Sequence, residues 1–277
     1  MVELDREQRR NLNVLLEPFM HQLVLPTILR GHAPARCWSD APESPSAALV
    51  WDIVNTFVFC VGDTSSSATV DRVGDTLVTE LLPGAKLAGH ELFHLQFAPE
   101  ELQESLRRRL SGYDLSTKLL HSYARSPEDS GAIPFAGEGF SDGLSLARLT
   151  GDVLSSDLGN MDEVRYCVNA CWRDRGRYLD EGIGCCITDR TNVASWCSTD
   201  YVIDGSADLY VETFSGYQRR GLATRAVSAC IDACRSAGWT VHWHCWSDNR
   251  GSVRLAEKHG FKLASVSPVL RVRSIDE

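Results

Sequence analysis

Apolar and polar positions along the first half of the chain predict a mixture of helices and strands. Leucines and a phenylalanine recur three and four residues apart near the start, a spacing typical of an amphipathic helix despite Pro18. Further along, two short apolar runs flank Asn55 and predict a β-hairpin. The elements expected in this half are a helix over 3–24, hairpin strands over 48–52 and 56–61, strands over 77–82 and 91–97, and a helix from Pro99 to Leu110.

A polar stretch rich in glycine and serine separates this half from the next. Residues 126–143 contain Ser-Pro-Glu-Asp-Ser-Gly and Gly-Glu-Gly-Phe-Ser-Asp-Gly, a composition typical of a linker or long loop. We therefore expect two domains, 1–135 and 136–277. The elements expected in the second are a strand over 144–149, a helix over 162–172, and a hairpin of strands 182–187 and 193–199.

A strand, a glycine-bearing loop and a helix follow one another between Asp208 and about residue 235. The loop reads Gln218-Arg-Arg-Gly221, and a second strand over 240–245 and a short helix over 249–261 come after it. A loop that leads from a strand into a helix presents backbone N–H groups and the positive end of the helix dipole to an anion. The sequence therefore predicts a phosphate-binding loop.

This order of motifs resembles the GNAT superfamily of acetyl-CoA-dependent acyltransferases, whose loop pattern is Gln/Arg-x-x-Gly-x-Gly/Ala. Gln218, Gly221 and Ala223 stand at its defining positions, and Asn249 and the pair Gly-Phe261 follow in the family's order. The segment is most similar to the branch typified by the zwittermicin A resistance acetyltransferase. One such loop alone is also compatible with an ordinary strand-to-helix turn, whereas the whole succession is specific.

The resemblance implies the fold class of the chain. Over residues 136–277 it implies an α/β (α+β) GNAT fold, with a mixed, centrally splayed β-sheet flanked by helices. For residues 1–135 it implies a degenerate GNAT-like domain that lacks the cofactor loop. The residues of the first half by themselves indicate only a mixed α/β segment.

Acetyl-CoA is the acyl donor that the resemblance implies, and no metal is expected. In the family, the strand before the loop lies beside the pantetheine and the loop holds the pyrophosphate. Asn249 would reach the pantetheine arm, and it is equally suited to cap the last helix. The cofactor-binding residues carried over to this sequence are Val211, Glu212, Thr213, Gln218, Arg219, Arg220, Gly221, Leu222, Ala223, Thr224 and Asn249.

Amide formation needs a proton acceptor, because an alkyl amine with a pKa of about 10.4 is almost wholly protonated at pH 7. Strand alternation puts Asp208, Tyr210 and Glu212 on one face of the strand that enters the loop. In relatives the base is a carboxylate on this strand. A gapless count places it at Ala207, and a β-bulge would bring in Asp208. Asp208 is the first candidate and Glu212 the second, although each is also compatible with a solvated strand-end charge.

The general acid of many relatives is missing. They carry a Tyr one turn before Gly-Phe, where this chain has Ala256. The CoA thiolate would then take its proton from water or from Tyr210. Direct attack by the amine on the thioester needs no covalent enzyme intermediate, so the cysteines have no assigned role. His242 and His244 are interpreted as substrate-cleft or packing residues on the second strand.

Charge and composition limit the classes of partner that the sequence predicts. The chain has 28 basic and 37 acidic residues and a formal net charge of −9, which argues against a general nucleic-acid partner and favours a cationic substrate. Its start is too charged for a signal peptide and no apolar run reaches about 18 residues, so we expect a cytoplasmic protein and no membrane partner. The ten cysteines are expected to be reduced and mostly buried. Nothing in the sequence indicates the oligomeric state.

Two other functions are compatible with parts of the sequence. His90-Glu-Leu-Phe-His94 matches the H-E-x-x-H pattern of zinc peptidases, but that site requires a helix, and these residues are expected in a strand. A non-catalytic acyl-CoA-binding regulatory module would explain the missing Tyr. The function expected first is an N-acetyltransferase that moves the acetyl group of acetyl-CoA to a primary amine of a small molecule, such as an amino-bearing antibiotic or metabolite.

Overall fold

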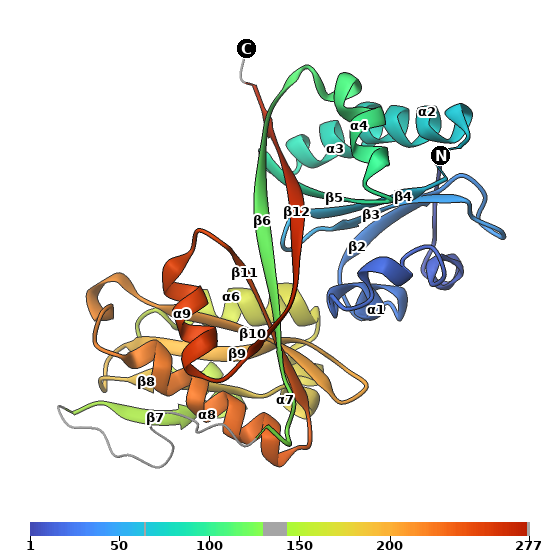
Figure 1. The fold of residues 1–277 in the computed structure, drawn as a ribbon. Helices are drawn as coiled ribbons and strands as arrows, with labels where there is room; N and C mark the ends of the chain where they lie inside the picture. The colour runs from blue at the N-terminus through green and yellow to red at the C-terminus, as the bar shows by residue number, and fades with distance from the viewer. Residues whose placement is uncertain (64, 130–142, 276–277) are drawn as a thin grey trace. The chain divides into compact units, whose positions relative to one another are not determined.

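The computed structural model describes residues 1–63, 65–129 and 143–275, and the chain divides into two compact units that can be followed in Figure 1. Unit 1 comprises residues 1–119 and 268–277, and unit 2 comprises residues 120–267. The boundary expected between residues 135 and 136 lies outside the described residues.

Unit 1 is built on a sheet with the strand order β1-β2-β3-β4-β5-β12. Only the β4 and β5 pair is parallel. Helices α2, α3 and α4 pack on one face of this sheet and bury a single apolar core (Figure 1). The elements are β1 (Val2–Glu3), α1 (Val24–Leu29), β2 (Ala35–Ser39), β3 (Ala47–Asp52), β4 (Phe57–Gly62), α2 (Ser67–Thr76), α3 (Leu82–Leu87), β5 (Leu92–Ala98), α4 (Glu101–Arg107), the start of β6 (Tyr113–Arg125) and the end of β12 (Lys262–Ser274).

Most of the elements expected in the first half are confirmed, and two are wrong. The hairpin around Asn55, the strand over 91–97 and the helix after Pro99 are present. The helix expected over 3–24 is replaced by 3-10 turns and the short helix α1. A 3-10 turn begins with Pro18 near its start, and proline has no N–H to continue a longer helix through this point.

The strand expected over 77–82 is helical instead. Residues Leu77–Leu81 form a π-helical turn that joins α2 to α3. Val73, Leu77 and Leu81 recur every four residues and are fully buried. This spacing places the three side chains on one face of a helix. Residues 77–82 alone have the composition of a strand, but the four-residue period that begins at Val73 determines the structure.

Unit 2 is built on a sheet with the strand order β6-β11-β10-β9-β8-β7, in which only β10 and β11 pair in parallel. Figure 1 shows α8 and α9 over one face and α6 over the other. The expected mixed sheet flanked by helices is confirmed. The elements are the end of β6, β7 (Ser145–Arg148), α5 (Gly151–Leu154), α6 (Met161–Trp172), α7 (Arg175–Glu181), β8 (Gly184–Thr188), β9 (Val193–Ile203), β10 (Ser206–Thr213), α8 (Leu222–Ser236), β11 (Thr240–Trp246), α9 (Arg250–Lys258) and the start of β12.

Two strands carry the chain from one unit to the other. The chain leaves unit 1 within β6 and returns to it within β12. The end of β6 pairs with β11 in unit 2, whereas the end of β12 pairs with β5 in unit 1. The sequence pattern predicts no element over residues 113–125, so the strand β6 that pairs with β11 is a finding of the structure.

Candidate functional site

The parallel strands β10 and β11 separate part of the way along their length. They pair from Ser206 opposite Thr240 to Asp208 opposite His242, and both strands then continue without further pairing to each other. Beyond Asp208, the edge of β10 that faces β11 therefore has no strand partner among the described residues. Backbone N–H and C=O groups on a free edge need hydrogen-bond partners. The expected central splay is present, and it leaves an edge suited to an extended ligand that contains amides.

The loop between β10 and α8 has a backbone shape that depends on glycine. Gly221 has a φ of +76° and Arg219 a φ of +60°, both in the left-handed region. A Cβ placed on Gly221 would have no neighbouring atom within 4 Å, so the space in front of the loop is open. Gly221 is therefore required by its dihedral angle, and the open space allows a ligand to approach the backbone.

Side chains of the unit hold this loop in place. Tyr217 donates a 2.5 Å hydrogen bond to Asp189 in the turn between β8 and β9. That hydrogen bond lowers the pKa of the Asp189 carboxyl. Gln218 donates from Nε2 to the carbonyl of Thr213 at 3.2 Å, and the guanidinium of Arg220 lies 6.0 Å from the Tyr217 ring centroid. The loop is thus fixed from both ends before any ligand binds.

The first turn of α8 has the properties of an anion site. Gly221 is its N-cap residue and supplies no side-chain oxygen to the first amides. Arg219 and Arg220 are exposed directly before it. Uncapped N–H groups, the helix dipole and two guanidinium groups together favour a diphosphate. Leu222 and Thr224 point into the core, so they would contact such a group through their backbone.

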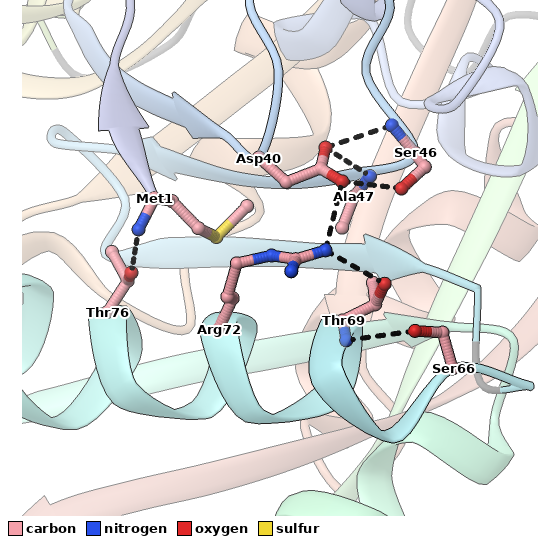
Figure 2. Close-up of polar contacts among 8 residues, drawn as sticks. All are labelled: Met1, Asp40, Ser46, Ala47, Ser66, Thr69, Arg72 and Thr76. Carbon is pink, nitrogen blue, oxygen red and sulfur yellow. Dashed lines mark hydrogen bonds and ion pairs between the residues drawn. The ribbon is translucent and has the colours of Figure 1, made fainter.

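The corresponding helix start in unit 1 is capped by its own side chain. The Ser66 hydroxyl accepts a hydrogen bond from the amide of Thr69 at the start of α2 (Figure 2). Arg72 donates to the Thr69 hydroxyl and pairs with Asp40 at 3.6 Å. Its first turn is therefore occupied by contacts within the unit, and the exposed Asp63 precedes it.

Asn249 caps the last helix of unit 2. Its Oδ1 accepts a 3.2 Å hydrogen bond from the amide of Ser252 in the first turn of α9. The Ser252 hydroxyl in turn accepts a 3.0 Å hydrogen bond from Nε1 of Trp243 on β11. The capping role expected for Asn249 is confirmed. Its amide nitrogen lies on an exposed residue and is compatible with the second expected role toward the cofactor.

Asp208 lies where the two strands separate. It is the last residue of β10 that pairs with β11, and its side chain is 12% exposed. The pairing of β10 with β9 is irregular between Ala207 and Leu209, the kind of register shift that would bring Asp208 to the base position in place of Ala207. Its Oδ1 lies 3.3 Å from Nε2 of His244 on β11. Asp208 is thus a nearly buried carboxylate at the mouth of the splay.

Tyr210 and Glu212 follow along β10 on the face away from α8. Tyr210 is 39% exposed, and its ring centroid lies 5.1 Å from that of Trp196. Burial raises the pKa of the Glu212 carboxyl, and the nearby charge of Glu163 raises it further. Burial also raises the pKa of the Tyr210 hydroxyl, followed by the charge of Glu212. This face carries aromatic rings and carboxylates, a combination suited to a cationic acceptor.

Two other groups singled out in the sequence lie away from this site. Ala256 is fully buried in the core under α8 and α9. His94 lies on strand β5, as expected, where Nδ1 is 3.2 Å from the Thr56 hydroxyl and the ring stacks on Phe57. The helix that a zinc-peptidase motif requires is absent at these residues, and in the described part of the chain no three His, Cys, Asp or Glu side chains are arranged to hold a metal ion.

The ten cysteines are free thiols, and nine of them are buried. This confirms their interpretation as small apolar residues. Across the described ranges, no helix has both the length and the apolar character needed to cross a membrane.

Sequence reasoning missed the residues that support the site from other segments. Tyr217 and Asp189 anchor the loop, and Ser122 of β6 contacts His244. The tyrosine at position 217, inside the loop, could have indicated the contact with Asp189. Ser122 gave no signal, because its place depends on which distant strand pairs with β11.

Comparisons with known proteins agree with this architecture. A family model described as GNAT acetyltransferase matches residues 15–268. An uncharacterized N-acetyltransferase of Bacillus subtilis, YdfB, is 27% identical over 120 residues, which are 43% of this chain. The match spans 45% of the length of that relative, so less than half of it is compared.

Solved structures show the same fold at low identity. A GCN5-related N-acetyltransferase-like protein from Streptococcus suis has a TM-score of 0.67 at 17% identity and covers 96% of this chain and 99% of its own. A tandem GNAT protein from the clavulanic acid biosynthesis pathway has a TM-score of 0.61 at 11% identity, over 100% of this chain and 98% of its own.

The splayed sheet and its loop define a protein of the GNAT-like α/β class. The match to the family model covers most of the chain, and the chain therefore belongs to the GNAT acetyltransferase family. The similarity supports the family as a whole and does not single out the zwittermicin branch.

Proposed function

We propose that the chain is an acetyl-CoA-dependent N-acetyltransferase with its cofactor site in unit 2. The observation that carries this proposal is the separation of β10 from β11 directly before an uncapped, basic helix start. Pantetheine contains two amides that suit the free edge of β10, at Val211 to Thr213. The diphosphate of CoA suits the amides and guanidinium groups between Gln218 and Thr224.

The acceptor that we propose is the primary amine of a small molecule, such as an amino-bearing antibiotic or metabolite. Asp208, Glu212 and Tyr210 lie along β10 where an amine would meet the thioester, and the formal net charge of −9 favours a cation. The amine would attack the thioester directly. Ten free cysteines suit a reducing compartment, and we propose the cytoplasm.

Calorimetric titration with acetyl-CoA, beside desulfo-CoA, tests the cofactor site. We expect saturable binding of one equivalent per chain with a dissociation constant in the range of about 1 μM to 1 mM, typical of enzyme substrates. No binding would overturn the proposal. Incubation with a panel of small amines, read by mass spectrometry for an added acetyl group, then tests transfer. Binding without transfer to any amine would favour the non-catalytic module.

A further inference from the structure

Two nearly buried polar atoms face each other at the mouth of the splay without forming a hydrogen bond. Oδ1 of Asp208 and Nε2 of His244 are 3.3 Å apart, close enough for an ion pair but outside the angles of a hydrogen bond. Neither atom has another hydrogen-bond partner among the described residues. An unpaired buried polar atom is costly, because it loses its hydrogen bonds to water, so such atoms are uncommon and often mark functional sites.

The place of His244 follows from the pairing of three strands. It lies two residues beyond His242, the last residue of β11 that pairs with β10, and so within the open part of the splay. On its other edge β11 pairs with β6, where Ser122 lies directly opposite His244. The Ser122 hydroxyl is 3.0 Å from Nδ1 of His244 and the residue is 3% exposed. One ring nitrogen is therefore held by β6 while the other faces β10.

We propose that His244 and Asp208 together accept the proton that the acceptor amine loses, and that Ser122 is a positioning residue for the imidazole. This inference rests on the proposed function and deepens it. In the protonated imidazole both ring nitrogens are donors. Nδ1–H then donates to the Ser122 hydroxyl, and the Nε2–H charge lies beside the Asp208 carboxylate. Ser122 and Asp208 thus lie beside the two ring nitrogens of His244, an arrangement that suits a proton acceptor.

The proposed step balances as follows for an ammonium acceptor and acetyl-CoA. One ammonium proton moves to the His244 and Asp208 pair, and the freed lone pair forms the C–N bond to the thioester carbonyl carbon. The C–S bond breaks and CoA leaves as a thiolate. The second proton lost by the nitrogen neutralises the thiolate, and the pair releases its proton to solvent when the product leaves.

Ser122, His244 and Asp208 are also the residue types of a hydrolase triad, in which the serine is the nucleophile. Ser122 is almost completely buried near the C-terminal end of β6, so a thioester has no access to its hydroxyl. An acyl-serine intermediate is therefore not part of the proposal, and the acetyl group passes directly to the amine.

The ionisable groups that face His244 in the described residues are few. Asp208 approaches His244 from β10, and His242 lies two residues away on β11, the strand of His244 itself. Strand β6 contributes the neutral Ser122 hydroxyl. Burial lowers the pKa of His242, so near neutral pH it adds little positive charge. Asp208 is thus the charged group that lies beside His244 in the proposed pair.

Replacement of His244 tests the proposal. We expect His244→Gln to lower kcat by about 100-fold at pH 7, because a positioned base contributes about 10² to 10⁴ in rate. We also expect loss of the acidic limb of the kcat profile and an unchanged dissociation constant for acetyl-CoA. His121→Gln is the matched control, since His121 lies on β6 beside Ser122 and contacts Tyr123 on the other face. It should leave both measurements unchanged.

A second measurement does not require turnover. NMR of the imidazole signals, with His244 assigned by the His244→Gln spectrum, should show that the ring signals of His244 shift in Asp208→Asn and in Ser122→Ala, because each change alters a contact of one ring nitrogen. Full activity and an intact acidic limb in His244→Gln, with normal transfer by the unmodified protein, would overturn this inference alone. Absence of acetyl-CoA binding by the unmodified protein would overturn the proposed function and this inference with it.

Discussion

Both units contain a strand, a loop, a helix and a second, parallel strand, and they differ in what this arrangement leaves open. In unit 1, β4 and β5 pair over five positions, up to Val61 opposite Ala98 near the ends of both strands. In unit 2, β10 and β11 pair over three positions and then separate. When a strand is paired along both edges, its backbone N–H and C=O groups are not available to a ligand. The free strand edge of the candidate site therefore depends on where pairing stops, and the two units share the same strand order.

The loops that precede α2 and α8 also differ in what they leave available to a ligand. The unit 1 loop has the acidic Asp63, and Ser66 caps its helix, so the amide of Thr69 has an acceptor within the unit. The unit 2 loop has two arginines and Gly221, which leaves those groups to a ligand. One polypeptide thus contains two versions of one motif, of which only the unit 2 version combines an uncapped helix start with a glycine at positive φ.

Gly221→Glu is the most severe test of this contrast. We expect acetyl-CoA affinity to fall by about 100-fold or more, because like charges brought together cost several kcal/mol and glutamate is strained at a φ of +76°. Calorimetric titration measures the effect. Ser65→Glu in the unit 1 loop is the matched control and should bind normally. Normal affinity in Gly221→Glu would remove the cofactor site from this loop.

Asp208→Asn should have the next largest effect. We expect kcat to fall by about 100-fold with little change in acetyl-CoA affinity, because the change removes a proton-accepting charge and keeps the shape of the side chain. Steady-state kinetics with an identified amine measure this. Asp63→Asn in unit 1 should leave the rate unchanged. Equal rates for Asp208→Asn and the unmodified protein would exclude Asp208 as a base.

The two units also differ in a measurable response to pH, through His94 in unit 1. Burial, followed by the charge of Arg271, lowers the pKa of His94 to about 4 from its usual 6.5. The unfolded chain therefore binds this proton more strongly between pH 4 and 6.5, so His94 makes unit 1 less stable as the pH falls through that window. Above pH 6.5 this penalty is absent.

The free energy of unfolding should decrease between pH 7 and pH 4.5, and we expect this decrease to be smaller by about 1–2 kcal/mol in His94→Gln. The value is reduced because the side chain is partly exposed to solvent. Urea unfolding at pH 4.5 and 7, with hydrogen exchange of β5 to report on unit 1, measures it. His90→Gln serves as the control. An equally steep pH dependence in His94→Gln would show that other groups govern the acid response.

Ser66→Ala should have the smallest effect. Removal of the N-cap of α2 is expected to destabilise unit 1 by about 1 kcal/mol, because an orphan amide loses its side-chain acceptor. Thermal unfolding measures this, with Ser67→Ala as the control at the first helical position. Acetyl-CoA affinity should not change. Binding of a second equivalent of acetyl-CoA by Ser66→Ala would show that the Ser66 cap alone prevents unit 1 from binding the cofactor.

The candidate cofactor loop could be predicted because its determinants are local. A glycine at a positive φ, the two arginines and the flanking strand and helix all lie within about 30 consecutive residues. The hairpin around Asn55 and the strand at 91–97 were predicted for the same reason. The count along the strand pointed to Ala207, and only the register shift between β10 and β9 in the structure brings in Asp208.

The remaining features depend on contacts between distant segments. Ser122 meets His244 only because β6 pairs with β11, and no local pattern determines that choice. The residues 77–82 have the composition of a strand, and their helical period becomes visible only when Val73 is included. Pairing that stops after three positions is likewise a property of two strands together and cannot be predicted from either one.

The passage of β12 back into unit 1 sets an order of events during synthesis. Leu270 to Arg273 pair with Leu95 to Leu92, so the strand that covers β5 leaves the ribosome about 150 residues after Leu119. At about 5–20 residues per second that interval is about 8–30 s. During this time β5 is an open strand edge, the kind of surface on which nascent chains pair wrongly or recruit chaperones. The part of the protein made first is therefore the part that is completed last.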